Sequence, residues 1–329
     1  MFQRPTSIPD MLYLAIIFHM HQPYYKNLLT QESLKPWVRL HGIKDYMDMV
    51  EMLKDYPSMR LTFNLVPSLL EQVEDYTTGA VKDKFLEMSY KPAAELNCQD
   101  KQFLYENFFS INKDKVIALS PRYYDLYLKK QAKKPFTPED YLDLQVWFNL
   151  AWFDPSFRQN IPELNELVKK ARFFDENDKH ILLEKQLEVL EEIIPTYRKY
   201  MSSGQIESIL SPFYHPILPL LYSTNLAREA NPKMSVPKIK FSYPADVKAQ
   251  IENAINFFKE KLGREPVGMW PSEESVCEHI LPEIIQSGIK WVVTDEAILF
   301  KSLKKKKRDT ALLYQPHLLK REEGNLNIV

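Results

Sequence analysis

The sequence predicts an α/β fold, and three observations carry that prediction. An eight-residue apolar run from Met11 to Phe18 is typical of a buried strand, and it is far shorter than the roughly 20 residues that cross a membrane. Extended and helical patterns alternate after it. A mainly helical stretch then covers about residues 75–200, and the alternation resumes near residue 204. We therefore expect one domain over residues 1–329, built as a sheet or barrel with a helical insertion.

Prolines close the first two predicted strands. The first strand leads into Phe18-His-Met-His-Gln-Pro23, and the second, Met59 to Val66, is followed by Pro67. Proline has no backbone N–H to give to a sheet, so the chain turns at both places. Residues 36–53 predict a loop that leads into a helix, because apolar side chains recur there at helical spacing. These side chains are Ile43, Tyr46, Met47, Val50 and Leu53.

Helical patterns dominate the segment from about residue 75 to 200. The clearest predicted helix covers Asp178 to Ile194, with a broad apolar face and charges on the other side. Pro195 is expected to end or kink this helix. We interpret the segment as an insertion between strands rather than a separately folding domain, and its charges as a solvated face.

Strands and helices alternate again after the insertion. Gly288 is expected to stop a helix, and Asp295 directly follows a strand. The predicted elements are a strand at 206–210, a helix at 244–262, a strand end at 267–270, a helix at 275–287 and a strand at 291–294.

Composition excludes several classes of protein. Hydrophobic residues make up 45% of the chain, which rules out a wholly disordered or fibrous protein. The formal net charge of -1 argues against a generally basic nucleic-acid binder. Cys98 and Cys277 alone cannot build a disulfide scaffold or a four-cysteine zinc site. The 7 glycines form no phosphate-binding loop pattern, and Lys304 to Arg308 predict a solvated loop.

Polar and aromatic side chains gather on or just after the predicted strands. In α/β barrels the carboxyl ends of the strands form one mouth that carries the active site, so we expect these side chains to converge. They are His19, His21, Gln22, Glu207, His215, Trp270, Glu273, Glu274, Asp295 and Glu296.

His19 and His21 are two residues apart on a strand and therefore point to the same face. Such a pair fits a metal site, as in barrel hydrolases with paired histidines on the first strand. It fits equally well a pocket that forms hydrogen bonds to sugar hydroxyls. A third interpretation is one buried structural histidine beside an exposed one. The residues alone leave all three open.

Glu273 and Asp295 follow two neighbouring strand ends, 22 residues apart. Glycoside hydrolysis needs such a pair, because one carboxylate attacks the anomeric carbon or activates water while the other protonates the departing oxygen. The alternative is that Glu273 and Glu274 only begin a helix, where the helix dipole favours acids. Trp270 is either a platform for a sugar ring or an ordinary core residue.

Four motifs, in order along the chain, resemble the first four sequence regions of glycoside hydrolase family 57. They are Phe18-His-Met-His-Gln-Pro23, Gly204-Gln-Ile-Glu207, Gly268-Met-Trp-Pro-Ser-Glu273 and Val293-Thr-Asp295. Similar supporting stretches occur at residues 36–41, 62–67, 149–155 and 211–219, so the resemblance covers about residues 11–300.

The resemblance implies a distorted (β/α)7 barrel that acts on α-glucans such as starch, glycogen and maltooligosaccharides with retention of configuration. The family includes α-amylases, amylopullulanases, glucanotransferases and branching enzymes. By the same resemblance Glu273 is the nucleophile and Asp295 the general acid/base, with no metal and no cofactor. The implied substrate-binding residues are His19, His21, Gln22, Glu207, His215 and Trp270.

The end of the chain departs from the family pattern. Family members carry a fifth region after the barrel, usually followed by a helical bundle, whereas this sequence ends within a predicted strand at residues 326–329. We therefore expect a barrel truncated at its C-terminus, without the family's helical region.

Two other functions stay open on the sequence. One is a metal-dependent barrel hydrolase that uses His19 and His21 with His215 or Asp295, and the other is a non-catalytic or incomplete glucan-binding remnant. The expected partner is an α-glucan, with no nucleic acid and no membrane, and the expected location is the cytoplasm because no targeting segment is recognisable. The sequence gives no indication of oligomeric state, and it does not distinguish a hydrolase from a transferase.

Overall fold

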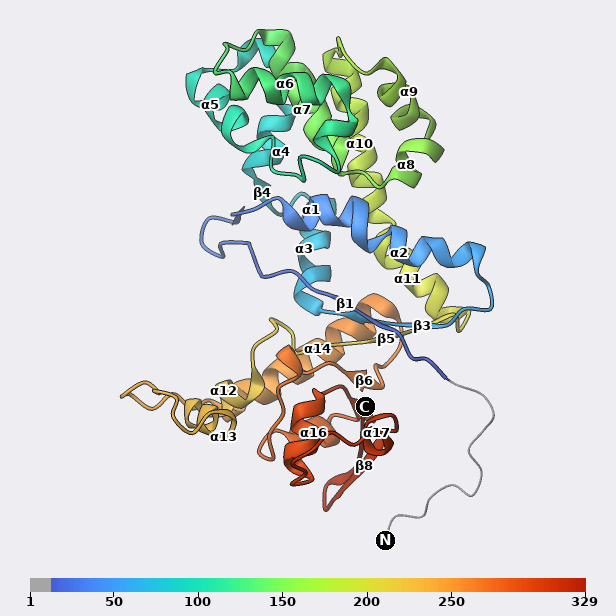
Figure 1. Cartoon of the computed structure of the whole chain (residues 1–329), viewed down its shortest axis with the longest axis vertical. Coiled ribbons are helices and arrows are strands. Elements are labelled where there is room, and N and C mark those ends of the chain that lie inside the picture. The colour runs from blue at the N-terminus through green and yellow to red at the C-terminus, as the bar shows by residue number, and fades with distance from the viewer. Residues whose placement is uncertain (1–12) are drawn as a thin grey trace.

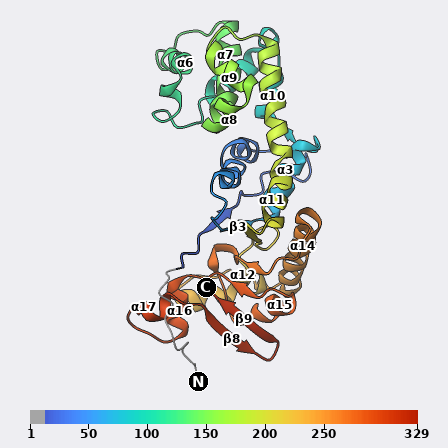
Figure 2. The ribbon, with the colours of Figure 1, turned by 90° about the vertical axis from the view of Figure 1, so that its right-hand side faces the viewer.

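The computed structural model describes residues 13–329, which form an elongated molecule (Figure 1). Helices of the central part of the sequence form one end, and the last third of the chain forms the other. Strands lie between them and within the second end, as the view turned by 90° also shows (Figure 2). The candidate site described below lies among these strands.

Three parallel strands form the first sheet. They are β1 (Ile17–Met20), β3 (Leu61–Leu65) and β5 (Ile206–Ile209), in the spatial order β1-β3-β5. The register places His19 opposite Asn64, and Asn64 opposite Ile209. Three side chains from adjacent strands therefore share one level of the sheet near its carboxyl end.

A second sheet follows β5 and continues the arrangement of parallel strands in chain order. It contains β6 (Gly268–Met269), β7 (Trp291–Val292) and β9 (Gly324–Ile328), all parallel, with β8 (His317–Arg321) antiparallel to β9 as a hairpin. A parallel bridge between Leu210 and Met269 joins this sheet to β5.

Parallel strands thus follow one another in chain order, and the α/β prediction is confirmed. Within residues 13–329 no strand pairing joins β1 to β8 or β9, so closure into the predicted (β/α)7 barrel is not shown. The predicted strand at residues 326–329 corresponds to β9, in which Leu326 is fully buried.

Helices fill the segment between β4 (Lys82–Asp83) and β5, as the sequence pattern predicts. A small parallel pair, β2 (Glu32–Ser33) and β4, stands at its entrance. Thr137 and Asp175 cap two of the helices through reciprocal side-chain and backbone hydrogen bonds, which explains where these helices begin. The helices are α4 (Lys84–Tyr90), α5 (Cys98–Asn107), α6 (Pro121–Gln131), α7 (Pro138–Trp152), α8 (Pro155–Asn160), α9 (Pro162–Lys170), α10 (Glu176–Glu191) and α11 (Ile193–Ser202). That this segment is an insertion within one domain stays a prediction.

The remaining helices lie before and after this segment. The predicted helix at residues 244–262 is α14, and Pro244 and Gly263 mark its ends as expected. The others are α1 (Trp37–His41), α2 (Asp48–Glu51), α3 (Pro67–Thr77), α12 (Leu218–Tyr222), α13 (Ala227–Ala230), α15 (Leu281–Gln286), α16 (Glu296–Ser302) and α17 (Thr310–Leu313). All five apolar side chains at helical spacing in residues 36–53 are buried.

Several predicted boundaries are wrong, including those of the first strand and of two helices. The first strand is β1, which starts at Ile17 and includes His19, and the predicted residues Met11 and Leu12 lie outside the described part. The helix predicted at 275–287 is only α15, because Pro282 removes a hydrogen bond and would clash with the carbonyl of residue 278 if the helix continued backwards. Pro195 lies in the first turn of α11, and the break from α10 falls at Glu192.

No helix within residues 13–329 has the combination of length and apolar character that is needed to span a membrane.

Candidate functional site

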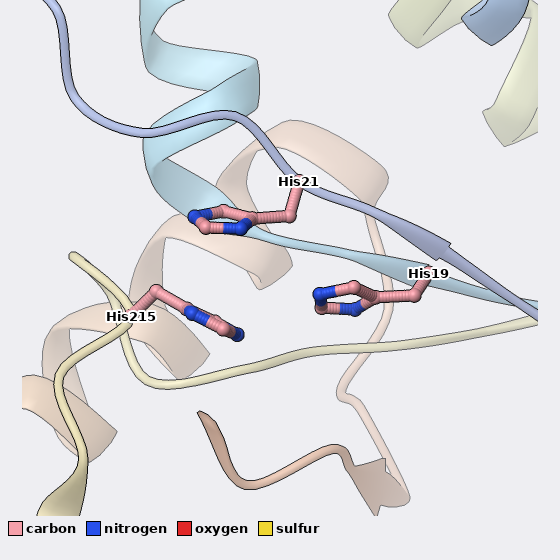
Figure 3. Close-up of side chains that lie close together, drawn as sticks. All are labelled: His19, His21 and His215. Carbon is pink, nitrogen blue, oxygen red and sulfur yellow. The ribbon is translucent and has the colours of Figure 1, made fainter. Parts of the chain in front are cut away.

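Four aromatic rings gather at the carboxyl ends of β1, β5 and β6. His19 belongs to β1, His21 directly follows it, and His215 and Trp270 follow β5 and β6. The rings of His21 and His215 stack with centroids 4.0 Å apart, and those of His19 and Trp270 stack at 5.0 Å. Figure 3 shows the three imidazoles facing one space. The structure therefore brings together four residues that are up to 251 positions apart in the sequence.

The imidazoles have an unusual electrostatic setting. Burial lowers the pKa of His19 and of His21, and the negative charge of Glu273 opposes that shift in both. Burial, with the neighbouring His21 and His19, lowers the pKa of His215 to about 3. The cluster is therefore uncharged at neutral pH, and its nitrogens can both donate and accept hydrogen bonds.

Two acids follow β6 in a backbone conformation that is rare for side-chain-bearing residues. Glu273 has φ 54° and Glu274 has φ 56°, and His215 across the site has φ 56°. Each such residue costs roughly 1–3 kcal/mol, and such residues cluster at functional sites. A single 3-10 turn covers Ser272–Glu274, but the left-handed backbone of Glu273 interrupts it and the α-helix α15 begins only at Leu281, so an α-helix start does not account for the two acids.

Asp295 follows β7 and caps α16. Its Oδ1 accepts a hydrogen bond from the backbone N–H of Ala297, with the two atoms 2.7 Å apart. Burial raises the pKa of Glu274, and the negative charges of Asp295 and Glu273 raise it further. Three carboxylates thus share one region beside the histidines, with Glu273 and Asp295 exposed and Glu274 half-buried.

Gln22 is held by two tyrosines. Its Nε2 donates to the Tyr46 hydroxyl at 2.8 Å, and its Oε1 accepts from the Tyr25 hydroxyl at 3.0 Å. The Tyr46 hydroxyl also lies 3.3 Å from the His21 carbonyl oxygen. These contacts hold Gln22 in place where the chain leaves β1, and its role as a substrate-binding residue stays a prediction.

Glu207 lies lower in the sheet than the histidines. It is in β5 opposite Thr62, two residues before the level of Asn64, and on the same face. Its Oε1 accepts a hydrogen bond from the indole of Trp291 in β7, with the two atoms 3.2 Å apart. Glu207 therefore belongs to a layer beneath the ring cluster, and its role as a substrate-binding residue stays a prediction.

The three histidines also meet the first requirement of a metal centre, because their nitrogens lie close together. One nitrogen each of His19, His21 and His215 lies within 4.8 Å of the others. The lone pairs of imidazoles lie in the ring planes, so a metal held by both His21 and His215 would have to lie close to both planes, whereas the two rings stack on one another with their planes inclined by 29°. A bound metal would therefore require at least one ring to turn.

Sequence reasoning missed Asn64 and Ser211, both fully buried between the strand ends. Asn64 lies 2.6 Å from His19 and Ser211 2.7 Å from the Trp270 carbonyl. Both belong to stretches noted for their resemblance, but a single polar residue in a strand carries no pattern that indicates such a contact. The left-handed backbone at Glu273, Glu274 and His215 had no sequence signal either, because no glycine stands there.

Parallel strands in chain order, with acids and aromatic rings at their carboxyl ends, define an α/β architecture whose loops carry the site. A model of glycosyl hydrolase family 57 matches residues 15–329, and the chain belongs to that family.

The individual proteins that this chain resembles share little sequence identity with it or match only part of it. The chain is 30% identical over 97 residues to alpha-amylase 1 of Dictyoglomus thermophilum, a match that covers 30% of this chain and 11% of that protein. The crystal structure of the alpha-amylase AmyC from Thermotoga maritima has a TM-score of 0.51 and 16% identity, covering 95% of this chain and 44% of that one. The GH57-type branching enzyme of Pyrococcus horikoshii has a TM-score of 0.49 and 16% identity, covering 96% of this chain and 45% of its own. The AmyC likeness shows the fold, and this chain spans less than half of both solved structures.

Proposed function

We propose that the protein is a retaining enzyme acting on α-glucans, with Glu273 as nucleophile and Asp295 as general acid/base. One observation carries this proposal. Glu273 has a left-handed backbone, and its negative charge raises the pKa values of His19 and His21 against the effect of burial. Asp295 follows the neighbouring strand, and the charges of Asp295 and Glu273 both raise the pKa of Glu274, so the three acids lie close together. Two acids from adjacent strand ends beside a cluster of aromatic rings are what double displacement at a sugar requires.

The first step forms a covalent glycosyl-enzyme. Protonated Asp295 gives its proton to the glycosidic oxygen as the bond from that oxygen to the anomeric carbon breaks. The Glu273 carboxylate forms a bond to the anomeric carbon, and the shortened glucan leaves with the transferred proton. Asp295 is then a carboxylate and Glu273 an ester.

The second step returns both acids to their starting state. Asp295 takes the proton of water, or of a hydroxyl on another glucan, and the resulting oxygen nucleophile attacks the anomeric carbon. The ester bond to Glu273 breaks, so two inversions give net retention. Water yields hydrolysis and a sugar hydroxyl yields transfer.

The ring cluster supplies the substrate contacts in this proposal. Trp270 offers an apolar face to a sugar ring, and the uncharged His19, His21 and His215 exchange hydrogen bonds with sugar hydroxyls. Gln22 keeps the β1 end in place through Tyr25 and Tyr46. Glu207, which accepts a hydrogen bond from Trp291 in the layer below the rings, is a further substrate-binding residue in this proposal.

Product analysis on maltoheptaose tests the proposal. The proposed enzyme releases shorter maltooligosaccharides, or converts the substrate into a ladder of shorter and longer ones, and a chelator does not change the rate. Activity lost with chelator and restored by zinc would contradict it in favour of a metal-dependent hydrolase. A folded chain that binds maltoheptaose without any product would contradict it in favour of a glucan-binding protein.

A further inference from the structure

A chain of hydrogen bonds, buried at its centre, joins the carboxyl ends of four strands beneath the ring cluster. The Asn64 amide nitrogen lies 2.6 Å from His19 Nδ1 and 2.9 Å from the Ser211 hydroxyl. The Ser211 hydroxyl lies 2.7 Å from the carbonyl oxygen of Trp270. His19, Asn64, Ser211 and Trp270 belong to β1, β3, the end of β5 and the end of β6, and the two middle residues are fully buried.

The directions of these hydrogen bonds follow from counting hydrogens. A serine hydroxyl has one hydrogen, and the carbonyl of Trp270 can only accept, so Ser211 donates to Trp270. The longer contact of 3.4 Å from the Ser211 hydroxyl to Asn64 Oδ1 competes poorly with the one of 2.7 Å. Ser211 therefore accepts from Asn64, and the group that Asn64 turns toward it is the NH₂.

The same NH₂ faces His19. Its second hydrogen points to Nδ1 of the imidazole, which must then carry a lone pair rather than a proton. Rotating the amide by 180° would set the Asn64 oxygen against the Ser211 oxygen, whose hydrogen is already given away. A neutral imidazole with an accepting Nδ1 carries its proton on Nε2.

We propose that Asn64 is a positioning residue that fixes His19 as its Nε2–H tautomer, so that His19 presents a hydrogen-bond donor to the site. Ser211 sets the direction of the Asn64 amide and ties it to the Trp270 carbonyl. The Trp270 N–H is itself bonded to the Leu210 carbonyl, with N and O 2.8 Å apart, so the backbone that leads into Glu273 is held on both sides.

The role of the His19 Nε2–H donor in catalysis rests on the proposed function. The charge of Glu273 acts on His19, so the Nε2–H lies in the field of the nucleophile and of the sugar oxygens around it. With the other tautomer the nitrogen facing the site would be an acceptor, and it would repel those oxygens.

Nitrogen NMR of the full chain labelled with [15N]histidine tests the tautomer directly. The His19 signals are assigned by their loss in His19→Gln. We expect Nε2 to carry the proton and Nδ1 to show the shift of an unprotonated ring nitrogen. A proton on Nδ1 in the folded wild-type protein would overturn the proposal, whether or not the protein turns over glucans.

Asn64→Asp reverses the polarity of the contact. A carboxylate can only accept here, so the His19 proton should move to Nδ1, and His19 should titrate at higher pH than in the wild type. We expect kcat/KM on maltoheptaose to fall roughly 10- to 100-fold, with its pH profile shifted in the same direction. Asn177→Asp, on the exposed face of α10, is the control and should change neither the tautomer nor the rate.

Ser211→Ala covers the case in which Asn64→Asp fails to fold. Without Ser211 the amide is free to turn, so both His19 tautomers should be detected. An unchanged single tautomer in Ser211→Ala would contradict the role of Ser211, and an unchanged tautomer in a folded Asn64→Asp would contradict that of Asn64. A wild-type protein with the Nε2–H tautomer but no glucan turnover would support the positioning and contradict the proposed function instead.

Discussion

The indole of Trp291 donates a hydrogen bond to the carboxylate of Glu207, with Nε1 and Oε1 3.2 Å apart. The two residues come from β7 and β5, and Gly268 of β6 lies opposite Trp291 in the sheet register. A Cβ on Gly268 would lie 2.6 Å from Cζ2 and 2.7 Å from Nε1 of that indole. The missing side chain of Gly268 thus gives Trp291 the room to reach Glu207.

Gly268→Ala should therefore destabilise the protein by crowding, by about 1–3 kcal/mol in urea unfolding. Trp291→Val has no ring and so lacks the atoms that the new Cβ would meet, and Gly268→Ala should therefore cost much less in the Trp291→Val background. We expect a coupling of at least about 1 kcal/mol in the double-mutant cycle. Equal costs in both backgrounds would show that the indole does not occupy this space.

Glu273→Gln should lower kcat by on the order of 10⁴-fold or more while the unfolding temperature stays unchanged, because the amide cannot form the glycosyl ester. Glu265→Gln, an exposed acid in a surface ion pair with Lys259, is the matched control and should retain full activity. Glu274→Gln should reduce activity far less than Glu273→Gln. If Glu274→Gln inactivates and Glu273→Gln does not, the nucleophile is Glu274.

Acid should destabilise the protein through His215. Burial, with the neighbouring His21 and His19, lowers its pKa to about 3, whereas the unfolded chain takes up a proton near pH 6.5. Below pH 6.5 the unfolded state binds the extra proton, so stability falls as pH falls toward the folded value. The loss at pH 5 relative to neutral pH is about 2 kcal/mol.

His215→Asn should remove that part of the acid destabilisation, measured as the difference in unfolding free energy between pH 7.5 and pH 5. His279→Asn replaces an exposed histidine and should leave the difference as in the wild type. Identical pH dependence in wild type and His215→Asn would mean that His215 accepts a proton readily in the folded protein.

Asp48 should make the stability of the protein depend on pH in the opposite direction. Its Oδ1 is buried without a hydrogen-bond donor among residues 13–329. Burial, together with the charge of Asp154, raises its pKa to about 6. The folded state holds the proton more tightly than the unfolded chain, so stability falls as pH rises from about 4 through 6.

Asp48→Asn should stabilise the protein at pH 8 by up to about 3 kcal/mol, and the gain should shrink toward zero near pH 4. Asp55→Asn, an exposed residue in the same segment, should change the free energy of unfolding by less than about 0.5 kcal/mol at either pH. A gain from Asp48→Asn that does not depend on pH would contradict the explanation by buried charge.

Much of the fold could be predicted because its signals are local. The helix α14 has a proline at its start, a glycine at its end and apolar residues at helical spacing, and all three act within the segment. The helix predicted at 275–287 shows where prediction from local signals fails. Its apolar spacing is helical throughout, but Pro282 permits a helix only from its own first turn onward.

The candidate site could be predicted only in part, because its residues meet through the sheet. Positions at strand ends indicated His19, His21, Trp270, Glu273 and Asp295. Asn64 and Ser211 gave no such indication, since their contacts to His19 and Trp270 depend on the register of three strands. The left-handed turn at Glu273 is likewise imposed by its surroundings and not by its residue type.

The most direct test of the central claim is to trap the glycosyl-enzyme. Asp295→Asn keeps the side-chain oxygen that caps α16 but cannot activate water, and α-maltosyl fluoride needs no acid for its leaving group. Mass spectrometry of this variant after acid quenching should find one maltosyl group on the peptide that contains Glu273, attached at Glu273. An adduct on a different residue, or turnover of the fluoride to the β-anomer without any adduct, would contradict a retaining mechanism with Glu273 as nucleophile.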